Sequence, residues 1–158
     1  MDADRLFLLL HLIAAYWYVM GLTAVQIPLI RGWQSNDIEV QAGSFEEASH
    51  YQGVLLVPGA IAAGATGVAL WARLDYSLLT TGWLLLLEAL YIATLLVCLP
   101  LIGMGLRRTR LAALKARHLG QPTPQLEQAL RDSVPLFFSG IATILVPAMT
   151  YLSVFRPF

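Results

Sequence analysis

Charge is scarce in this chain, and its scarcity decides the class of protein. Only 13% of the 158 residues are Asp, Glu, Lys or Arg, whereas soluble domains carry about 25%. Hydrophobic residues make up 58%, and the mean hydropathy is +0.67. Long apolar runs alternate with short polar ones, which is typical of a multi-pass membrane protein. The formal net charge is zero, so the composition gives no reason to expect a nucleic acid as partner.

Cysteine is also scarce, and the usual catalytic motifs are missing. The single cysteine, Cys98, excludes an internal disulfide and any cysteine-based zinc site. The sequence contains no phosphate-binding glycine loop, no nucleophile elbow and no metalloprotease helix. Hydrolase and nucleotide chemistry therefore lack support, and the sequence favours a protein that is not an enzyme.

Four stretches are long enough to cross a membrane, which takes roughly 20 apolar residues for about 30 Å of hydrocarbon. They cover residues 6–30, 51–71, 78–106 and 134–155. We therefore predict an all-α membrane protein, a four-transmembrane-helix bundle that forms a single domain over residues 1–158. The third stretch is longer than a span needs, so its helix must tilt or continue out of the bilayer.

The first two connections carry turn and capping signals. Residues 31–50 are interpreted as a polar loop. Within it, Ser44 and Glu47 match a capping box, which predicts that the second helix starts near Phe45. Residues 72–77 are predicted to form a tight turn.

The third connection, residues 107–133, is the largest polar segment. It is predicted to be an amphipathic cytosolic extension of the third helix that ends at Gly120. Thr123 and Pro124 then match the cap and first turn of a short helix reaching about Asp132. Basic residues mark this cytosolic segment: Arg107, Arg108, Arg110, Lys115 and Arg117.

The distribution of Lys and Arg predicts the orientation. Arg5, Arg73 and Arg156 fall on one side of the predicted bundle. The other seven fall on the opposite side, namely Arg31, Arg107, Arg108, Arg110, Lys115, Arg117 and Arg131. Because positive residues stay in the cytoplasm, both termini are expected on the outer, periplasmic side of a bacterial inner membrane. The basic segment either serves this topology alone or also binds anionic lipid heads.

Small residues predict where helices approach closely. Gly59, Ala63 and Gly67 recur every four residues in the second span, with Gly64 beside them. Such spacing opens a flat face for another backbone, either within the bundle or on a partner, which would be another membrane chain or a second copy. Pro58, Pro100 and Pro147 each predict a kink in one of three spans.

Two titratable residues, His11 and Glu88, lie well inside predicted spans, where such groups are costly and indicate function by default. The helical rise places His11 roughly 8 Å deep, Glu88 roughly 9 to 15 Å deep and Met149 roughly 9 Å deep, all from the outer face. The three residues are therefore predicted to share one layer of the bundle.

Three interpretations of this layer stay open. His11 and Glu88 could hydrogen-bond to each other as an intramembrane polar pair, which would keep both stable in a low-dielectric interior. Alternatively, His11 could ligate a b-type haem iron with Met149 opposite. A third interpretation is a proton or metal-ion relay that uses His11 and Glu88 and opens to the outside.

Short motifs along nearly the whole chain resemble a group of bacterial integral membrane proteins related to the copper-resistance D-type and J-type protoporphyrinogen oxidase proteins. The motifs are Leu8-Leu9-Leu10-His11-Leu12-Ile13, Val57-Pro58, Gly82-Trp83-Leu84, Leu99-Pro100-Leu101 and Tyr151 to Pro157. The resemblance implies a four-helix bundle, with His11 where the J-type oxidases have a haem-associated histidine. Glu88 is not part of that pattern, and no basic partner in a later helix matches it.

The preferred hypothesis is a non-catalytic bundle that acts as an accessory subunit of a larger respiratory, photosynthetic or transport complex. The alternatives are a haem-binding redox protein that uses His11 and a small transporter or relay.

Overall fold

The computed structural model describes residues 3–73 and 81–157, and within that range all regular structure is helical. The elements in order are α1 (Ala3–Gln34), α2 (Ile38–Tyr51), η1 (Gln52–Leu56), α3 (Val57–Arg73), α4 (Gly82–Ala93), η2 (Thr94–Cys98), α5 (Leu99–Leu119), α6 (Pro124–Arg131) and α7 (Val134–Phe155). Four helical stretches of this range are long and apolar enough to cross a membrane. The predicted all-α, four-span class is confirmed.

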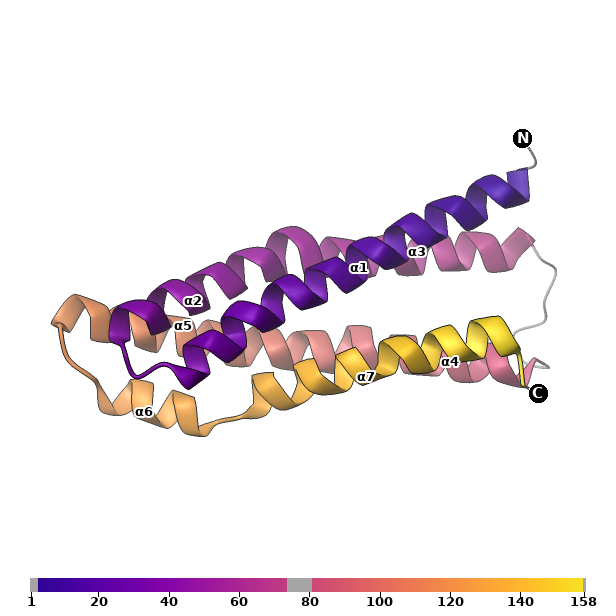
Figure 1. The fold of residues 1–158 in the computed structure, drawn as a ribbon. Coiled ribbons are helices and arrows are strands. Elements are labelled where there is room, and N and C mark those ends of the chain that lie inside the picture. Colours follow the sequence, from indigo (N-terminus) through magenta and orange to yellow (C-terminus); the bar gives the residue numbers. More distant parts are fainter. Residues whose placement is uncertain (1–2, 74–80, 158) are drawn as a thin grey trace.

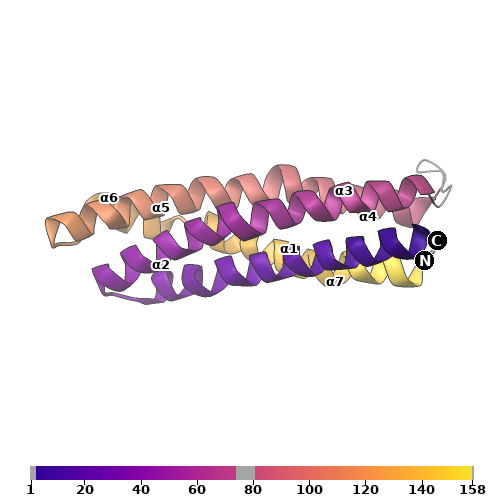
Figure 2. The ribbon, with the colours of Figure 1, turned by 90° about the horizontal axis from the view of Figure 1, so that it is seen from above.

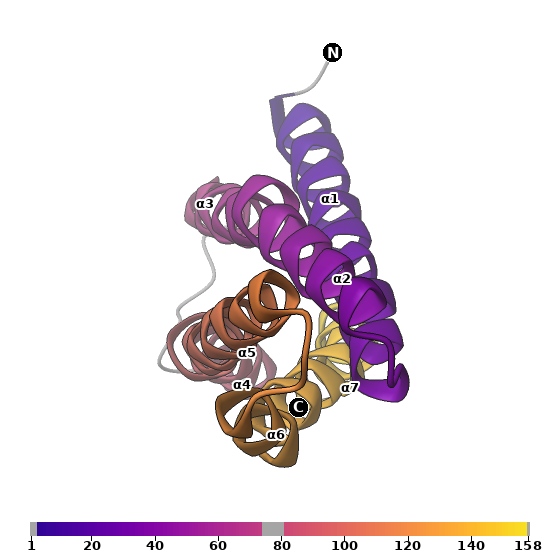
Figure 3. The same ribbon diagram turned by 90° about the vertical axis from the view of Figure 1, so that its left-hand side faces the viewer.

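The helices lie side by side in one elongated bundle (Figure 1). The start of α1, the end of α3, the start of α4 and the end of α7 lie at one end of the bundle. The turn between α1 and α2 lies at the other end, together with the end of α5 and all of α6. Figure 2 shows that α2 leads into α3, and α4 into α5, each along one line. The view along the bundle in Figure 3 shows α1, α2 with α3, α4 with α5, and α7 around the bundle axis, with α6 below α5.

The observed helix bounds extend most of the predicted spans. The first predicted span lies within α1, and the fourth coincides with α7. Residues 72 and 73 of the predicted turn belong to α3. The rest of that turn, and the predicted start of the third span at Leu78, lie outside the described residues.

The prediction that the second helix starts near Phe45 is wrong. That helix, α2, begins at Ile38. Asp37 caps it, since its carboxylate accepts a hydrogen bond from the Glu39 backbone N–H at 2.8 Å. An aspartate before the first turn satisfies one of the donors that the helix leaves free. Most of the predicted polar loop is therefore helical.

The predicted capping box at Ser44 does not form, because Ser44 lies inside α2. Its hydroxyl accepts a hydrogen bond from Arg31 Nε at 2.9 Å, and Glu47 forms an ion pair with the same arginine. The pattern of a serine followed by a glutamate three residues later therefore serves contact between two helices. The spacing of two residues along one helix does not show that both contact a residue of another helix.

The predicted ends of the third connection are confirmed. Gly120 follows α5 in the left-handed conformation at φ 67°, which glycine adopts without steric cost. Thr123 caps α6, accepting a hydrogen bond from the Leu126 N–H at 3.3 Å, and Pro124 occupies its first turn.

Two of the predicted proline kinks coincide with π-helical turns. η1 ends one residue before Val57-Pro58, and η2 ends one residue before Leu99-Pro100. A proline cannot donate to the carbonyl four residues back, and its ring crowds that carbonyl. A wider π turn just before the proline accommodates this loss, and such turns often mark functional positions.

The end of the bundle that holds the α1–α2 turn, the end of α5 and all of α6 carries most of the basic residues and is called the basic end. It has its own packed core. Phe45 of α2 is fully buried, and its ring meets Trp33 of α1 edge-on at 5.1 Å between centroids. Trp33 Nε1 also donates to the Leu130 carbonyl of α6 at 2.9 Å. The helix ends outside the predicted spans therefore form a folded cap on the bundle.

Candidate functional site

His11 lies on α1 and faces α3. Its Nδ1 is 3.1 Å from the Thr66 hydroxyl, and its ring lies against Gly67, where a β-carbon would approach Cε1 to 3.2 Å. The helical repeat places Thr66 and Gly67 on the side of α3 that meets α1. The predicted partner, Glu88, is not the group that His11 contacts.

Thr66 and the carbonyls of the preceding turn of α3 surround the ring of His11 with hydrogen-bond partners. The Thr66 hydroxyl donates its one hydrogen to the Ala62 carbonyl at 2.7 Å. The same hydroxyl also lies 3.2 Å from the Ala63 carbonyl, and the His11 ring forms a hydrogen bond with the Ala63 backbone. In the tautomer that carries the proton on Nδ1, the Thr66 oxygen accepts from His11 and Nε2 keeps its lone pair. A histidine held this way through one nitrogen resembles those whose other nitrogen binds a metal.

Glu88 lies half-buried on α4. Within residues 3–73 and 81–157, no hydrogen bond or ion pair joins it to His11. Tyr91 lies one turn further along the same helix. The structure thus places His11 at the contact of α1 with α3, and Glu88 on α4.

Tyr91 and Tyr18 form a second polar group in the spans. The Tyr91 hydroxyl donates to the Ala60 carbonyl of α3 at 2.7 Å. Tyr18 is buried, its hydroxyl has no hydrogen-bond partner among the described atoms, and it lies near Tyr91 and Cys98. The sequence carries no signal for the burial of this hydroxyl, because one sequence cannot say which way a helical side chain points.

Met149 lies on α7, partly buried. This helix packs against α1 and α4, so it borders the elements that carry His11 and Glu88. Within the described residues, no group of three or more His, Cys, Asp or Glu is placed to hold a metal ion.

The small residues of the second span face the inside of the bundle. A β-carbon at Gly59 would meet the backbone of Tyr18, and one at Gly64 would overlap the Tyr91 hydroxyl. Ala63 is buried between them. On the opposite helix, Gly21 faces the backbone of Leu56 in the same way. This face therefore joins α1 to the second span, and Tyr91 of α4 packs at its edge.

The basic end carries several exposed ion pairs. Arg108 meets Asp132 at 3.4 Å, and Arg117 meets Glu46 at 3.9 Å. Arg110 donates to the Ser49 hydroxyl at 3.0 Å. Exposed pairs of this kind contribute little stability, but they balance the charge of two of the five basic residues predicted for this segment, and a third, Arg110, is engaged by a neutral hydroxyl. Arg107 and Lys115 are exposed and have no such partner within the described residues.

The fold and its four apolar spans agree with the family that the sequence matches. Residues 5–157 match the family described as predicted integral membrane protein (DUF2269). The chain belongs to this family. No curated protein and no solved structure matches it. The family description supports insertion into a membrane and assigns no reaction.

Proposed function

We propose that this DUF2269 protein is a non-catalytic helical-bundle protein of the bacterial inner membrane, acting as an accessory subunit of a larger membrane complex. The observation that carries the proposal is the bond between His11 and Thr66. Through this hydrogen bond, the titratable side chain of His11 on α1 is held by Thr66 on α3, which is a structural role.

Other polar groups of the spans are used in the same way. Gln26 of α1 donates to the Ser139 carbonyl at 3.0 Å and to the Thr143 hydroxyl at 2.7 Å, both on α7. Tyr91 links α4 to the Ala60 carbonyl on α3. Such interhelical hydrogen bonds hold membrane helices in register. These contacts support a protein whose polar side chains inside the membrane hold the helices together.

The outer face of α7 supports a contact with another chain. A hollow of about 440 Å³ follows Pro147 on this face, bordered by Tyr151, Val154 and Phe155. These three side chains are more than half exposed. A concave apolar surface with aromatic residues at its edge suits a side chain from a second membrane helix.

The test is the mass of the protein extracted from its native membrane in a mild detergent. We expect it to migrate on a native gel as a complex with other membrane chains or as a homo-oligomer. Val154→Trp, which fills the hollow, should release the monomer. Ile144→Trp, equally exposed on α7, is the matched control and should not. A monomeric wild-type protein would contradict the proposal.

A second candidate function is b-type haem binding, and the lone pair that His11 Nε2 keeps in the Nδ1-protonated tautomer favours it. His11 and Met149 would hold the haem iron, and the haem would supply electron transfer. The resemblance to the copper-resistance D-type and J-type oxidase group is part of this proposal and rests on the short motifs alone.

An absorption spectrum of gently solubilised protein distinguishes the two functions. A Soret band that disappears in His11→Ala, weakens in Met149→Leu and persists in His118→Ala would establish haem binding and overturn the structural role of His11. A colourless protein that co-purifies with other membrane chains would eliminate the haem alternative. The relay interpretation remains a prediction, and ion uptake unchanged by Glu88→Gln would count against it.

A further inference from the structure

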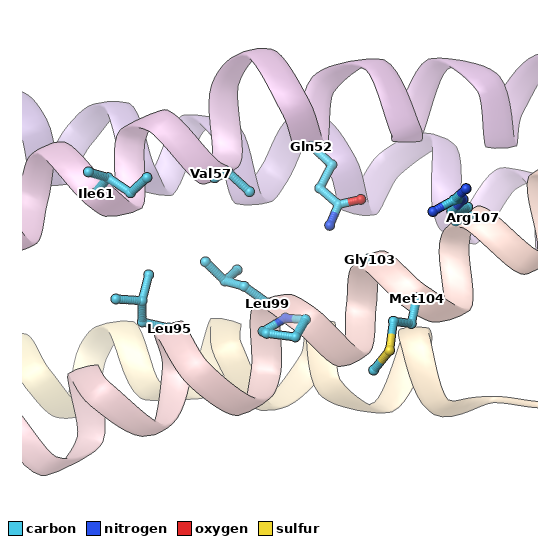
Figure 4. A pocket seen from close by; sticks show the side chains of 9 residues that line it. Gln52, Val57, Ile61, Leu95, Leu99, Gly103, Met104 and Arg107 are labelled. Atoms are coloured by element: carbon cyan, nitrogen blue, oxygen red, sulfur yellow. The ribbon is translucent and has the colours of Figure 1, made fainter.

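A groove of about 400 Å³ lies between the second and third spans (Figure 4). One wall comes from η1 and α3, the other from η2 and α5. At one end of the groove, α2 packs against α5. Beyond its other end, the Tyr91–Ala60 hydrogen bond joins the two spans again. The groove therefore occupies the stretch where both helices pass through their π turns and prolines.

The walls of the groove are apolar. Val57 and Ile61 line it from α3, and Leu95 and Leu99 line it from the opposite side (Figure 4). Gly103 adds no side chain, and a β-carbon there would overlap the Gln52 amide nitrogen. The glycine thus keeps the groove open beside its polar end.

That polar end holds Gln52 and Arg107, which Figure 4 shows at the same end of the groove. Within residues 3–73 and 81–157, neither side chain forms a hydrogen bond or an ion pair. Arg31, Arg108 and Arg117 of the same end of the bundle all meet acidic residues. The groove therefore ends at a cation whose charge is not balanced by the described part of the chain.

The length of the groove matches one leaflet of a membrane. From Arg107 to Leu95 the helical rise gives about 18 Å, and half of the hydrocarbon core is about 15 Å. Arg107 belongs to the polar end of α5, whereas Leu95 lies deep in the third span. The groove therefore runs from the headgroup region towards the middle of the bilayer.

We propose that this groove binds one anionic phospholipid from the leaflet at the basic end of the bundle. Its phosphate would pair with Arg107 and accept a hydrogen bond from the Gln52 amide, and one acyl chain would lie between the apolar walls. Basic pockets between membrane helices bind anionic headgroups through the same chemistry. The groove volume falls in the range of about 300–1,000 Å³ found for small-molecule sites.

The dimensions favour a lipid chain over a partner helix. A helix with side chains is about 10 Å across, which is wider than a single acyl chain. A partner helix could rest on the rim but could not fill the groove. A partner also needs an acidic residue within the membrane to meet Arg107, whereas a phospholipid carries its charge at the correct depth.

The headgroup assignment is tested by native mass spectrometry of the purified full chain with added phosphatidylglycerol or phosphatidylcholine. The wild type should retain one phosphatidylglycerol and should not retain phosphatidylcholine at equal concentration. Arg107→Gln should weaken phosphatidylglycerol binding about fivefold. Arg131→Gln makes the same charge change on α6 and should bind as the wild type does. Equal retention of the two lipids would overturn the proposal.

The position of the chain is tested by filling the groove. Ile61 is more than half exposed, so Ile61→Trp can be introduced without disturbing the core. It should abolish retention of phosphatidylglycerol, whereas Ile144→Trp on α7 should leave it unchanged. Phosphatidylglycerol that stays bound to a folded Ile61→Trp protein would overturn the proposal. None of these outcomes depends on the accessory-subunit role.

Discussion

Individual glycines determine how closely α1 approaches the second span. Gly21 faces the backbone of Leu56, and Gly59 faces the backbone of Tyr18, so each helix contributes one small residue to the crossing. Dispersion and close packing replace the hydrophobic effect as the force that joins helices in a membrane. The sequence identified the small residues of the second span. Gly21, isolated in a run of large side chains, gave no such signal.

We expect Gly21→Ala to destabilise the bundle. A β-carbon at this position would lie 2.7 Å from the Leu56 backbone, which cannot move aside as a side chain can. Overpacking of this kind costs about 1–3 kcal/mol, measurable as the free energy of unfolding in detergent.

The matched control is Gly140→Ala in α7, where a new β-carbon meets nothing within 4 Å. It should be neutral or stabilising by up to about 1 kcal/mol, because alanine favours helix over glycine. Equal effects of the two substitutions would mean that the close crossing does not exist.

The bond between His11 and Thr66 can be measured by a double-mutant cycle. His11→Ala, Thr66→Val and the double variant should give a coupling of about 0.6 kcal/mol, the average for hydrogen bonds between membrane helices. The same cycle with Glu88→Gln in place of Thr66→Val should give no coupling. A strong coupling of His11 to Glu88 would instead restore the predicted intramembrane pair.

At the scale of elements, the helix ends and the interruptions inside helices differ in how well the sequence predicted them. The ends at Gly120 and Thr123 followed from local chemistry, since a glycine stop and a threonine cap act within one turn. The start of α2 did not, because the predicted capping residue, Ser44, is engaged by Arg31 of another helix. The π turns before Pro58 and Pro100 were predicted only as kinks.

We expect Asp37→Ala to destabilise the basic end by about 1 kcal/mol, the usual effect of losing a capping side chain. Its carboxylate is the acceptor for the Glu39 N–H at the start of α2. Ser133→Ala is the control, because Ser133 precedes α7 without a capping hydrogen bond. Hydrogen exchange of the first turn of α2 reports the effect locally. Unchanged exchange there would contradict the assigned cap.

At the scale of the whole molecule, the basic residues collect at one end. The ends of the helices that carry Arg5, Arg73 and Arg156 lie together, and the other basic residues lie at the opposite end (Figure 1). The bundle arranges these charges as the loop count predicted. Which end faces the cytoplasm remains a prediction of the positive-inside rule.

Thiol labelling of intact cells tests that orientation. In a Cys98→Ser background, Ala3→Cys should react with a membrane-impermeant reagent added outside. Glu127→Cys, exposed on α6 at the basic end, should react only after the membrane is opened. The reverse pattern would place the basic end outside, and the lipid groove would then belong to the outer leaflet.

The sequence alone determined that this is a four-span helical membrane protein and roughly where each span lies. Hydrocarbon thickness sets the length of an apolar run, so hydropathy along the chain is sufficient for that conclusion. The direction of each side chain depends on which helices become neighbours, and a single sequence does not contain that information. Only the tertiary structure therefore showed that His11 contacts Thr66 and that Tyr91 contacts Ala60. It also showed that Gln52 and Arg107 lie together at the polar end of the groove.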